Sequence, residues 1–249
     1  MVLTLPNGKR IDLTQGIDIS IPLTNDVQNP RAWYMDVPRI EPVREKGWVG
    51  SVKEGGSVNF RNIYFNPHGH TTHTECLGHI TEKVYSVNKV LNQYFFEAVL
   101  FSVQPNKKYT PEGEDEVIEP EHLEGLRKYR KIDALVIRTL PNPAEKKSKN
   151  YSSTNPPFIS ADCLKLINQL EVKHLLIDLP SVDKEIDGGV LAFHHGFWEV
   201  PERPRHDRTI TELVYIPDTV SDGEYLLNLQ VASFENDAAP SRPVLFKVF

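Results

Sequence analysis

Three short and almost continuously apolar segments constrain the fold of this chain most strongly. They cover residues 98–103, 134–140 and 174–179. A strand whose side chains are buried on both faces of a sheet has this pattern, whereas a strand with one solvent-exposed face alternates apolar and polar residues. Segments with helical spacing precede or separate them at 87–96, 121–129 and 160–170. The alternation predicts an α/β domain built on a covered sheet.

Strand patterns also occupy both ends of the chain. Asn7-Gly8 separates two short apolar runs, which predicts a hairpin of residues 2–5 and 10–13. Further strands are expected at 16–23, 57–65, 209–216, 224–234 and 244–249, a short helix at 190–198, and loops at 25–44, 111–119 and 141–157. The sequence has no internal repeat and no clear linker. We therefore expect one mixed α/β domain over residues 1–249.

Composition excludes several classes of protein. The 249 residues carry a net charge of −6 without an extended basic block, which argues against nucleic acid or an anionic membrane surface as partner. No apolar stretch has transmembrane length, and the first residues lack a signal-peptide pattern. Only two cysteines are present, Cys76 and Cys163, which favours a reducing compartment. The sequence predicts a cytoplasmic protein.

The segment 66–79 concentrates groups that can bind metal ions. His68, His70, His73 and His79, four of the nine histidines, fall within twelve residues, together with Glu75. Imidazole and carboxylate are ligands that zinc, manganese and iron prefer. On a strand, His73 and Glu75 would project from the same face because they are two residues apart. The pattern predicts a metal-dependent hydrolytic site; a surface loop with ordinary histidine hydrogen bonds is the alternative.

Two further features point to the same kind of site. His194 and His195 lie together on a predicted helix, and Glu212 interrupts an otherwise apolar strand. A buried carboxylate needs a partner, for which a cation is the strongest candidate, while an exposed edge position is the alternative. Cys76 is adjacent to the predicted ligands, but apolar burial or a position next to the metal explains it better than a role as nucleophile.

The blocks of this sequence, taken in order, resemble the metal-dependent cyclase-like hydrolases, a family that includes bacterial kynurenine formamidase and isatin hydrolase. The family motif is His-x-Gly-Thr-His-x-Asp-x-Pro-x-His, and residues 71–79 read Thr-Thr-His-Thr-Glu-Cys-Leu-Gly-His. The other similar blocks are Asp18-Ile19-Ser20, the turn 178–183, His194 followed by Thr211-Glu212-Leu213, and the tail 238–243. Glu75 stands where the family has Asp, and Gly69 stands where it has its first histidine.

The resemblance implies both a fold and a set of roles. The fold would be a single mixed domain of the swivelling β/β/α type. His73 and Glu75 would bind a divalent metal, Zn or Mn, with His68 or His70 supplying a further ligand. A second ion would lie between Glu75, His194 and Glu212. His79 would be the general acid/base, and His195 would support or pack.

The expected function is hydrolysis of an amide, formamide or lactam carbon–nitrogen bond in a small molecule. A metal-free homologue that binds a ligand without catalysis, and a lyase or cyclase acting on a small polar substrate, are the alternatives. The family resemblance also implies a homodimer or homotetramer. The aromatic pair Trp33-Tyr34, within the loop 25–44, could then reach over a neighbouring subunit's site; ordinary packing of these aromatic side chains is the favoured alternative.

Overall fold

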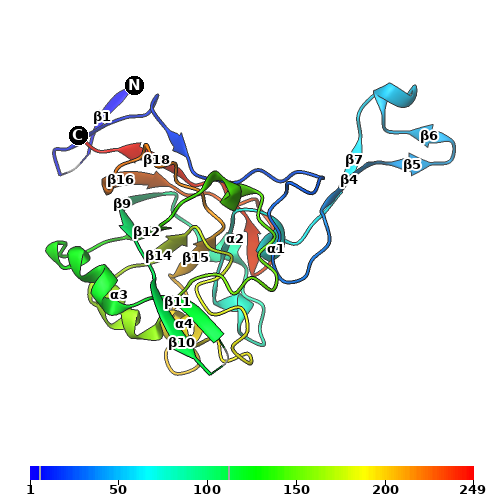
Figure 1. The fold of residues 1–249 in the computed structure, drawn as a ribbon. Helices are drawn as coiled ribbons and strands as arrows, with labels where there is room; N and C mark the ends of the chain where they lie inside the picture. Colours follow the sequence, from blue (N-terminus) through cyan, green and yellow to red (C-terminus); the bar gives the residue numbers. More distant parts are fainter. Residues whose placement is uncertain (6, 112) are drawn as a thin grey trace.

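The computed structural model describes residues 1–5, 7–111 and 113–249 (Figure 1). Pro6, in the turn of the predicted hairpin, and Glu112, in the predicted loop 111–119, lie outside the described residues. The main sheet has nine strands in the order β17-β8-β15-β14-β12-β9-β16-β18-β3. Their bounds are β3 Ile17–Asp18, β8 His73–Glu75, β9 Phe95–Val103, β12 Ala134–Thr139, β14 His174–Ile177, β15 Thr209–Glu212, β16 Gly223–Asn228, β17 Ala238–Pro240 and β18 Val244–Lys247.

The centre of the sheet consists of the predicted apolar strands. β9, β12, β14 and β15 run parallel, with Leu135 opposite Val99 on one side and Leu175 on the other. β12 and β14 are buried along their whole length. Antiparallel strands flank this centre on both sides, as expected from the two ends of the sequence. The prediction of one mixed α/β domain is confirmed.

Alternate residues of the central strands serve two separate apolar cores. Leu135 and Ile137 pack with Phe197 and the other helical side chains on one face. Val136 and Leu176 face the other way and pack with Leu227 of β16 and neighbouring side chains. Because strands far apart in the sheet order meet in this second core, the sheet curls around it. Helices cover one face of the sheet. The other face is covered by strands of the same sheet, because the sheet curls back over it.

The helices are few and short. They are α1 Pro67–His70, α2 Val87–Val90, α3 Leu164–Gln169 and α4 Ala192–Trp198, with the 3-10 helices η1 Val52–Glu54, η2 Leu77–His79, η3 Pro120–Lys128, η4 Ala144–Lys147 and η5 Ala161–Cys163. The predicted cap Ser160 accepts a hydrogen bond from the Asp162 amide at the start of η5. Among the described residues, the structure has no helix with the length and apolarity needed to cross a membrane.

The loop expected at 25–44 contains a strand, β4 Arg39–Pro42, so this prediction was wrong. Two further predictions of local structure were also wrong. The helix expected over 87–96 ends at Val90, because the chain joins β9 at Phe95 to pair with Asn228 of β16. The acidic loop expected at 111–119 contains a strand, β11 Gly113–Ile118, between β10 Asn106–Thr110 and β13 Phe158–Ile159. In both places pairing with distant strands outweighs the local preference of the sequence.

An arm extends away from the body of the molecule (Figure 1). It consists of the antiparallel pair β4 Arg39–Pro42 and β7 Arg61–Tyr64, followed outward by β5 Arg44–Glu45 and β6 Trp48–Val49. β7 is the shortened form of the strand predicted at 57–65, and all four of its residues are exposed. At the other end of the sheet, β1 Val2–Thr4 and β2 Arg10–Asp12 form the predicted hairpin.

Candidate metal centre

Strand β8 carries the centre of the site. It lies between β15 and β17, and all three of its residues are buried. His73 is directly opposite Glu212 of β15, and Glu75 is directly opposite Ile210. Directly opposite residues on antiparallel strands project from the same face, as do residues two apart on one strand. The register therefore brings His73, Glu75 and Glu212 together on one side of the sheet.

His73 and Glu212 meet with their side chains almost fully buried. Nε2 of His73 lies 3.4 Å from Oε2 of Glu212. The other ring nitrogen of His73, Nδ1, is 3.0 Å from the carbonyl oxygen of Thr71, so it is set to donate there and leave Nε2 unprotonated. The other carboxylate oxygen of Glu212 accepts a 3.1 Å hydrogen bond from the backbone amide of Val182. Contacts with the backbone of Thr71 and Val182 thus hold both side chains in place.

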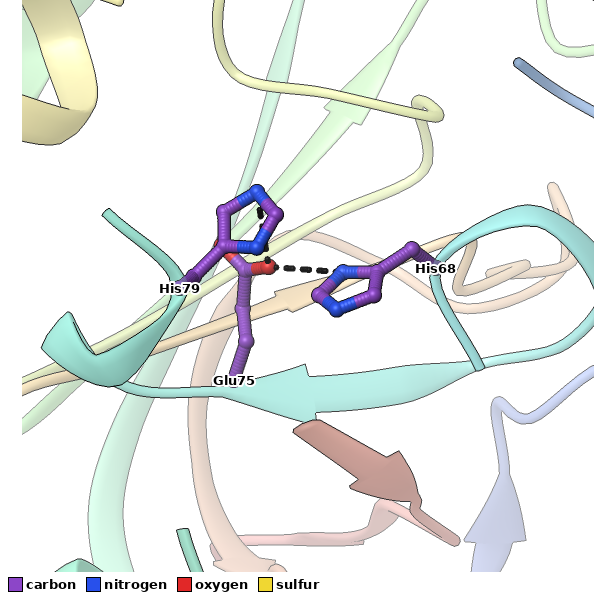
Figure 2. A group of neighbouring side chains, drawn as sticks. All are labelled: His68, Glu75 and His79. Carbon is purple, nitrogen blue, oxygen red and sulfur yellow. Dashed lines mark ion pairs between the residues drawn. The ribbon is translucent and has the colours of Figure 1, made fainter. Parts of the chain in front are cut away.

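Glu75 is surrounded by three imidazoles. Its Oε1 lies 3.1 Å from Nε2 of His194, and its Oε2 lies 3.1 Å from Nδ1 of His68 and 3.9 Å from Nε2 of His79. Figure 2 shows His68 and His79 reaching this carboxylate from two separate segments, α1 and η2, at either end of β8. A single buried carboxylate therefore connects all three histidines.

The structure separates the two histidines of α1. Asn66 caps this helix by accepting a hydrogen bond from the His68 amide, and the His68 ring lies against Glu75. The His70 ring points elsewhere. Its Nδ1 accepts a hydrogen bond from the Asn66 amide, and its Nε2 lies 2.8 Å from the carbonyl oxygen of Asp36. Both nitrogens of His70 are thus occupied by the backbone.

His194 reaches the site from the buried face of α4. Asp183, in the turn that resembles the family's, accepts hydrogen bonds from the amides of Phe193 and His194 at the start of this helix. The same carboxylate lies 2.6 Å from Nδ1 of His194, which turns Nε2 of the ring toward Glu75. His195 lies apart, with Nδ1 3.3 Å from the carbonyl oxygen of Val200.

The sequence analysis assigned no role to Asp237, which belongs to the same cluster. It precedes β17, and its Oδ2 lies 2.9 Å from Nε2 of His68 and 3.3 Å from Nδ1 of His79. The only sequence signal was its position immediately before the tail 238–243 that resembles the family's. Asp183 lay within a recognised block, but its contact with His194 depends on the tertiary fold.

The carboxylates and imidazoles of the cluster stabilise one another's charged forms. Burial disfavours ionisation of Glu75, but the adjacent imidazoles of His79, His194 and His68 outweigh it and hold the Glu75 pKa well below its usual range. Burial likewise disfavours charge on the imidazoles. The carboxylates of Asp237 and Glu75 nevertheless raise the pKa of His68 to about 10, and those of Asp183 and Glu75 raise the pKa of His194 to about 10.

The donor atoms fit a divalent metal. Ligand atoms of His68, Glu75 and His79 lie within 4.8 Å of one another, and so do those of His73, Glu75 and Glu212. Nε2 of His73 and Oε2 of Glu75 are buried without a hydrogen bond among the described residues. Unpaired buried polar atoms are costly, by about 1–3 kcal/mol each. A cation between the two groups would satisfy both atoms, with Glu75 common to the two sets.

A pocket of about 330 Å³ opens beside these groups. Its polar wall includes His68, His79, His194 and Glu212, and its apolar wall includes Trp33, Met35 and Leu191. A volume of this size accommodates a small organic molecule. The site therefore combines a cluster of titratable groups with space for a substrate that has an apolar portion.

Cys76 is adjacent to Glu75 in the sequence, but its side chain is not part of this cluster. It is fully buried, and its thiol donates to the carbonyl oxygen of Tyr85. Burial raises the pKa of Cys76 to about 12, which keeps it a thiol rather than a nucleophilic thiolate. Gly78, two residues beyond Cys76, has no room for a Cβ atom because the Tyr85 carbonyl oxygen would lie 2.3 Å from it. This close contact sets the path of η2 and places His79 at the pocket.

Comparison with known proteins identifies the family. Residues 11–184 match the family described as Putative cyclase. Since this match covers more than half of the chain, the protein belongs to that family. The resemblance inferred from the sequence blocks is confirmed.

The similarity to known proteins extends over nearly the whole chain. Kynurenine formamidase of Bacillus thuringiensis (strain Al Hakam) is 29% identical over 234 residues, which cover 93% of this chain and 97% of the relative. The predicted metal-dependent hydrolase from Bacillus stearothermophilus has a TM-score of 0.63 at 15% identity, covering 93% of this chain and 98% of that one. Isatin hydrolase A from Labrenzia aggregata has a TM-score of 0.62 at 13% identity and covers 93% of each chain. These structural likenesses show the same fold.

Proposed function

We propose that this protein is a metal-dependent hydrolase that cleaves an amide, formamide or lactam carbon–nitrogen bond in a small molecule. The observation that carries the proposal is the position of Glu75, which is shared by two sets of metal-ligating atoms at the wall of a pocket. The names of the relatives support it, since one is a kynurenine formamidase and another an isatin hydrolase.

We assign the ligands from the geometry of their free atoms. His73, Glu75 and Glu212 would hold one divalent ion, using the unpartnered Nε2 of His73. A second ion would be held by Glu75 together with His68, which lies at its Oε2, and His194, which lies at its Oε1. His68 is a better candidate than His70, since both nitrogens of His70 are occupied. This mixture of imidazole and carboxylate suits Zn or Mn.

The residues around the metal would divide the chemical work. A bound divalent ion polarises a carbonyl group and lowers the pKa of water. His79 is about one-third exposed, at 32%, and faces the pocket with Nε2 3.9 Å from Glu75. Imidazole is the commonest general acid and base among side chains, so His79 would accept a proton from water and return it to the departing nitrogen.

The apolar wall would bind the rest of the substrate. Trp33, Met35 and Leu191 line the same pocket as the histidines. The Trp33 segment is held in place by Tyr151, whose amide donates to the Arg31 carbonyl oxygen and whose ring packs in a small cluster with Ala32. We propose that Trp33 contacts an apolar or planar part of the substrate, which would orient the scissile bond toward Glu75.

Three wider proposals accompany this function. We propose that residues 1–249 act as one functional unit, and that the protein is cytoplasmic, in keeping with two buried free cysteines. We also propose a homodimer or homotetramer. The arm supports this, because an isolated two-stranded ribbon is marginally stable in water and this one exposes Phe60, Ile63 and Tyr64.

Hydrolysis of an aryl formamide and of isatin, each with added Zn²⁺ or Mn²⁺, tests the proposal. We expect carbon–nitrogen cleavage of at least one compound by the wild type and no cleavage by the double variant His73→Ala/Glu75→Ala. The variant His195→Ala is the matched control, because it removes a nearby histidine from outside the cluster, and it should retain activity. A metal-loaded wild type that cleaves neither these compounds nor a wider panel of amides and lactams would overturn the proposal.

A further inference from the structure

One oxygen atom of Asp237 contacts two imidazoles of the site. Oδ2 lies 2.9 Å from Nε2 of His68 and 3.3 Å from Nδ1 of His79. The two rings are stacked, with their centroids 4.3 Å apart and their planes at 27°. The carboxylate therefore contacts different nitrogens on the two rings, although the rings lie side by side.

This asymmetry determines which nitrogen of each ring faces Glu75. A carboxylate accepts hydrogen bonds, so it favours a proton on Nε2 of His68 and on Nδ1 of His79. The opposite nitrogens, Nδ1 of His68 and Nε2 of His79, lie 3.1 Å and 3.9 Å from the same oxygen, Oε2 of Glu75. Asp237 thus directs two different ring nitrogens toward one point.

The fold holds Asp237 itself in a fixed place. The carbonyl oxygen of Asp237 accepts a 3.0 Å hydrogen bond from the Cys76 amide, and the next residue, Ala238, is paired with Glu75 in the sheet. Its side chain is largely buried, with 16% exposed. The sheet register that places Glu75 therefore also places the carboxylate behind the two histidines.

We infer that Asp237 is a positioning residue that makes His68 bind metal through Nδ1 and presents Nε2 of His79 to the pocket. This inference rests on the proposed metal-dependent function. A carboxylate that holds the far nitrogen of a metal-binding histidine fixes both its tautomer and its orientation, and loss of such a partner typically weakens metal affinity about 10–100-fold.

Zinc affinity measured by competition with a chromophoric chelator is the first test. We expect Asp237→Ala to bind Zn²⁺ about 10–100-fold more weakly than the wild type. Asp237→Asn keeps an acceptor oxygen in place, so we expect it to recover part of that loss. Glu235→Ala is the matched control, because Glu235 is an exposed acid two residues away that contacts Asn88 and Lys89 outside the cluster. Its affinity should equal that of the wild type.

Nitrogen-15 NMR of the histidine rings in the Zn²⁺-loaded protein is the second test, and a purely structural role of Asp237 would not produce its pattern. We expect a protonated Nε2 and a metal-shifted Nδ1 for His68, and a protonated Nδ1 for His79. In Asp237→Asn, which should fold even if the alanine variant does not, the Nε2 proton of His68 should exchange faster with water.

The outcomes separate this inference from the function on which it rests. A wild type that binds no Zn²⁺ would remove the metal site and the inference with it. If Asp237→Ala binds Zn²⁺ as tightly as the wild type, the role of Asp237 is overturned but the metal site is not. A His68 ring that is protonated on Nδ1 in the Zn²⁺-loaded wild type would have the same consequence.

Discussion

Replacing Lys146 with Met should destabilise the protein through a buried carboxylate that is not among the proposed metal ligands. Nζ of Lys146 lies 2.8 Å from Oδ2 of Asp178 and also donates to the carbonyl and hydroxyl oxygens of Thr139. The Asp178 side chain is completely buried, and that of Lys146 is 11% exposed. The pair connects η4 to the end of β14, and the same loop carries Tyr151, which packs beside the Trp33 segment.

The structure gives both the size and the pH dependence of the effect. Removing one partner of a buried ion pair costs about 3–5 kcal/mol, and we expect about 3 kcal/mol because the carboxyl group can take up a proton instead. Burial raises the pKa of Asp178, and the nearby Lys146 opposes this rise. In Lys146→Met the Asp178 pKa should rise further. A carboxyl group whose pKa is raised in the folded state makes the protein less stable at higher pH. The loss of unfolding free energy in Lys146→Met, relative to the wild type, should therefore become smaller as the pH falls through that pKa.

Urea unfolding of the metal-free protein at pH 7 and pH 5, followed by circular dichroism, is the assay. With a slope of about 3 kcal/mol per molar urea, a loss of about 3 kcal/mol lowers the midpoint by about 1 M. Lys147→Met is the control, because Lys147 is exposed and its ammonium lies over the Tyr215 ring, an interaction that contributes below about 1 kcal/mol. Equal losses in the two variants, or a Lys146→Met deficit that does not change with pH, would refute this reasoning.

Four further substitutions distinguish the roles of residues around the pocket. His68→Ala should lose metal in elemental analysis, whereas His70→Ala should keep it and lose about 1–3 kcal/mol of unfolding free energy in urea, because it leaves two backbone groups unpaired. Asp183→Ala should weaken metal affinity about 10–100-fold in chelator competition, because it frees the His194 ring. Trp33→Ala should raise KM more than it lowers kcat in steady-state assays, since Trp33 lines the pocket but supplies no metal-ligating atom. An unchanged KM would contradict this role.

The sequence predicted those parts of the fold whose signal is local. The apolar runs at 134–140 and 174–179 are buried strands, and Ser160 caps a helix, since burial on two faces and capping each need only neighbouring residues. Strand β11 was missed because acidic residues are unfavourable in strands locally, and its pairing with β10 and β13 is a tertiary property.

In the candidate site, too, the sequence predicted what depends on local spacing and missed what depends on tertiary contacts. The proximity of His73 and Glu75 follows from a two-residue spacing on a strand, and the structure brings Glu212 beside them through the β8–β15 register. No local rule distinguished His68 from His70; the distinction arises from the hydrogen bonds of His70 to Asn66 and Asp36. Asp237 was missed since it is 158 residues beyond His79 and meets it only through the pairing of β17 with β8.

Metal content per chain is the decisive measurement for the proposed metal centre. Untagged wild-type protein and the His73→Ala/Glu75→Ala variant should be compared by elemental mass spectrometry, with circular dichroism to confirm that both are folded. The shared Glu75 and the unpartnered Nε2 of His73 predict near-stoichiometric or higher Zn or Mn in the wild type and its loss in the variant. A folded wild type that holds no metal, even after dialysis against excess Zn²⁺ and Mn²⁺, would contradict the account.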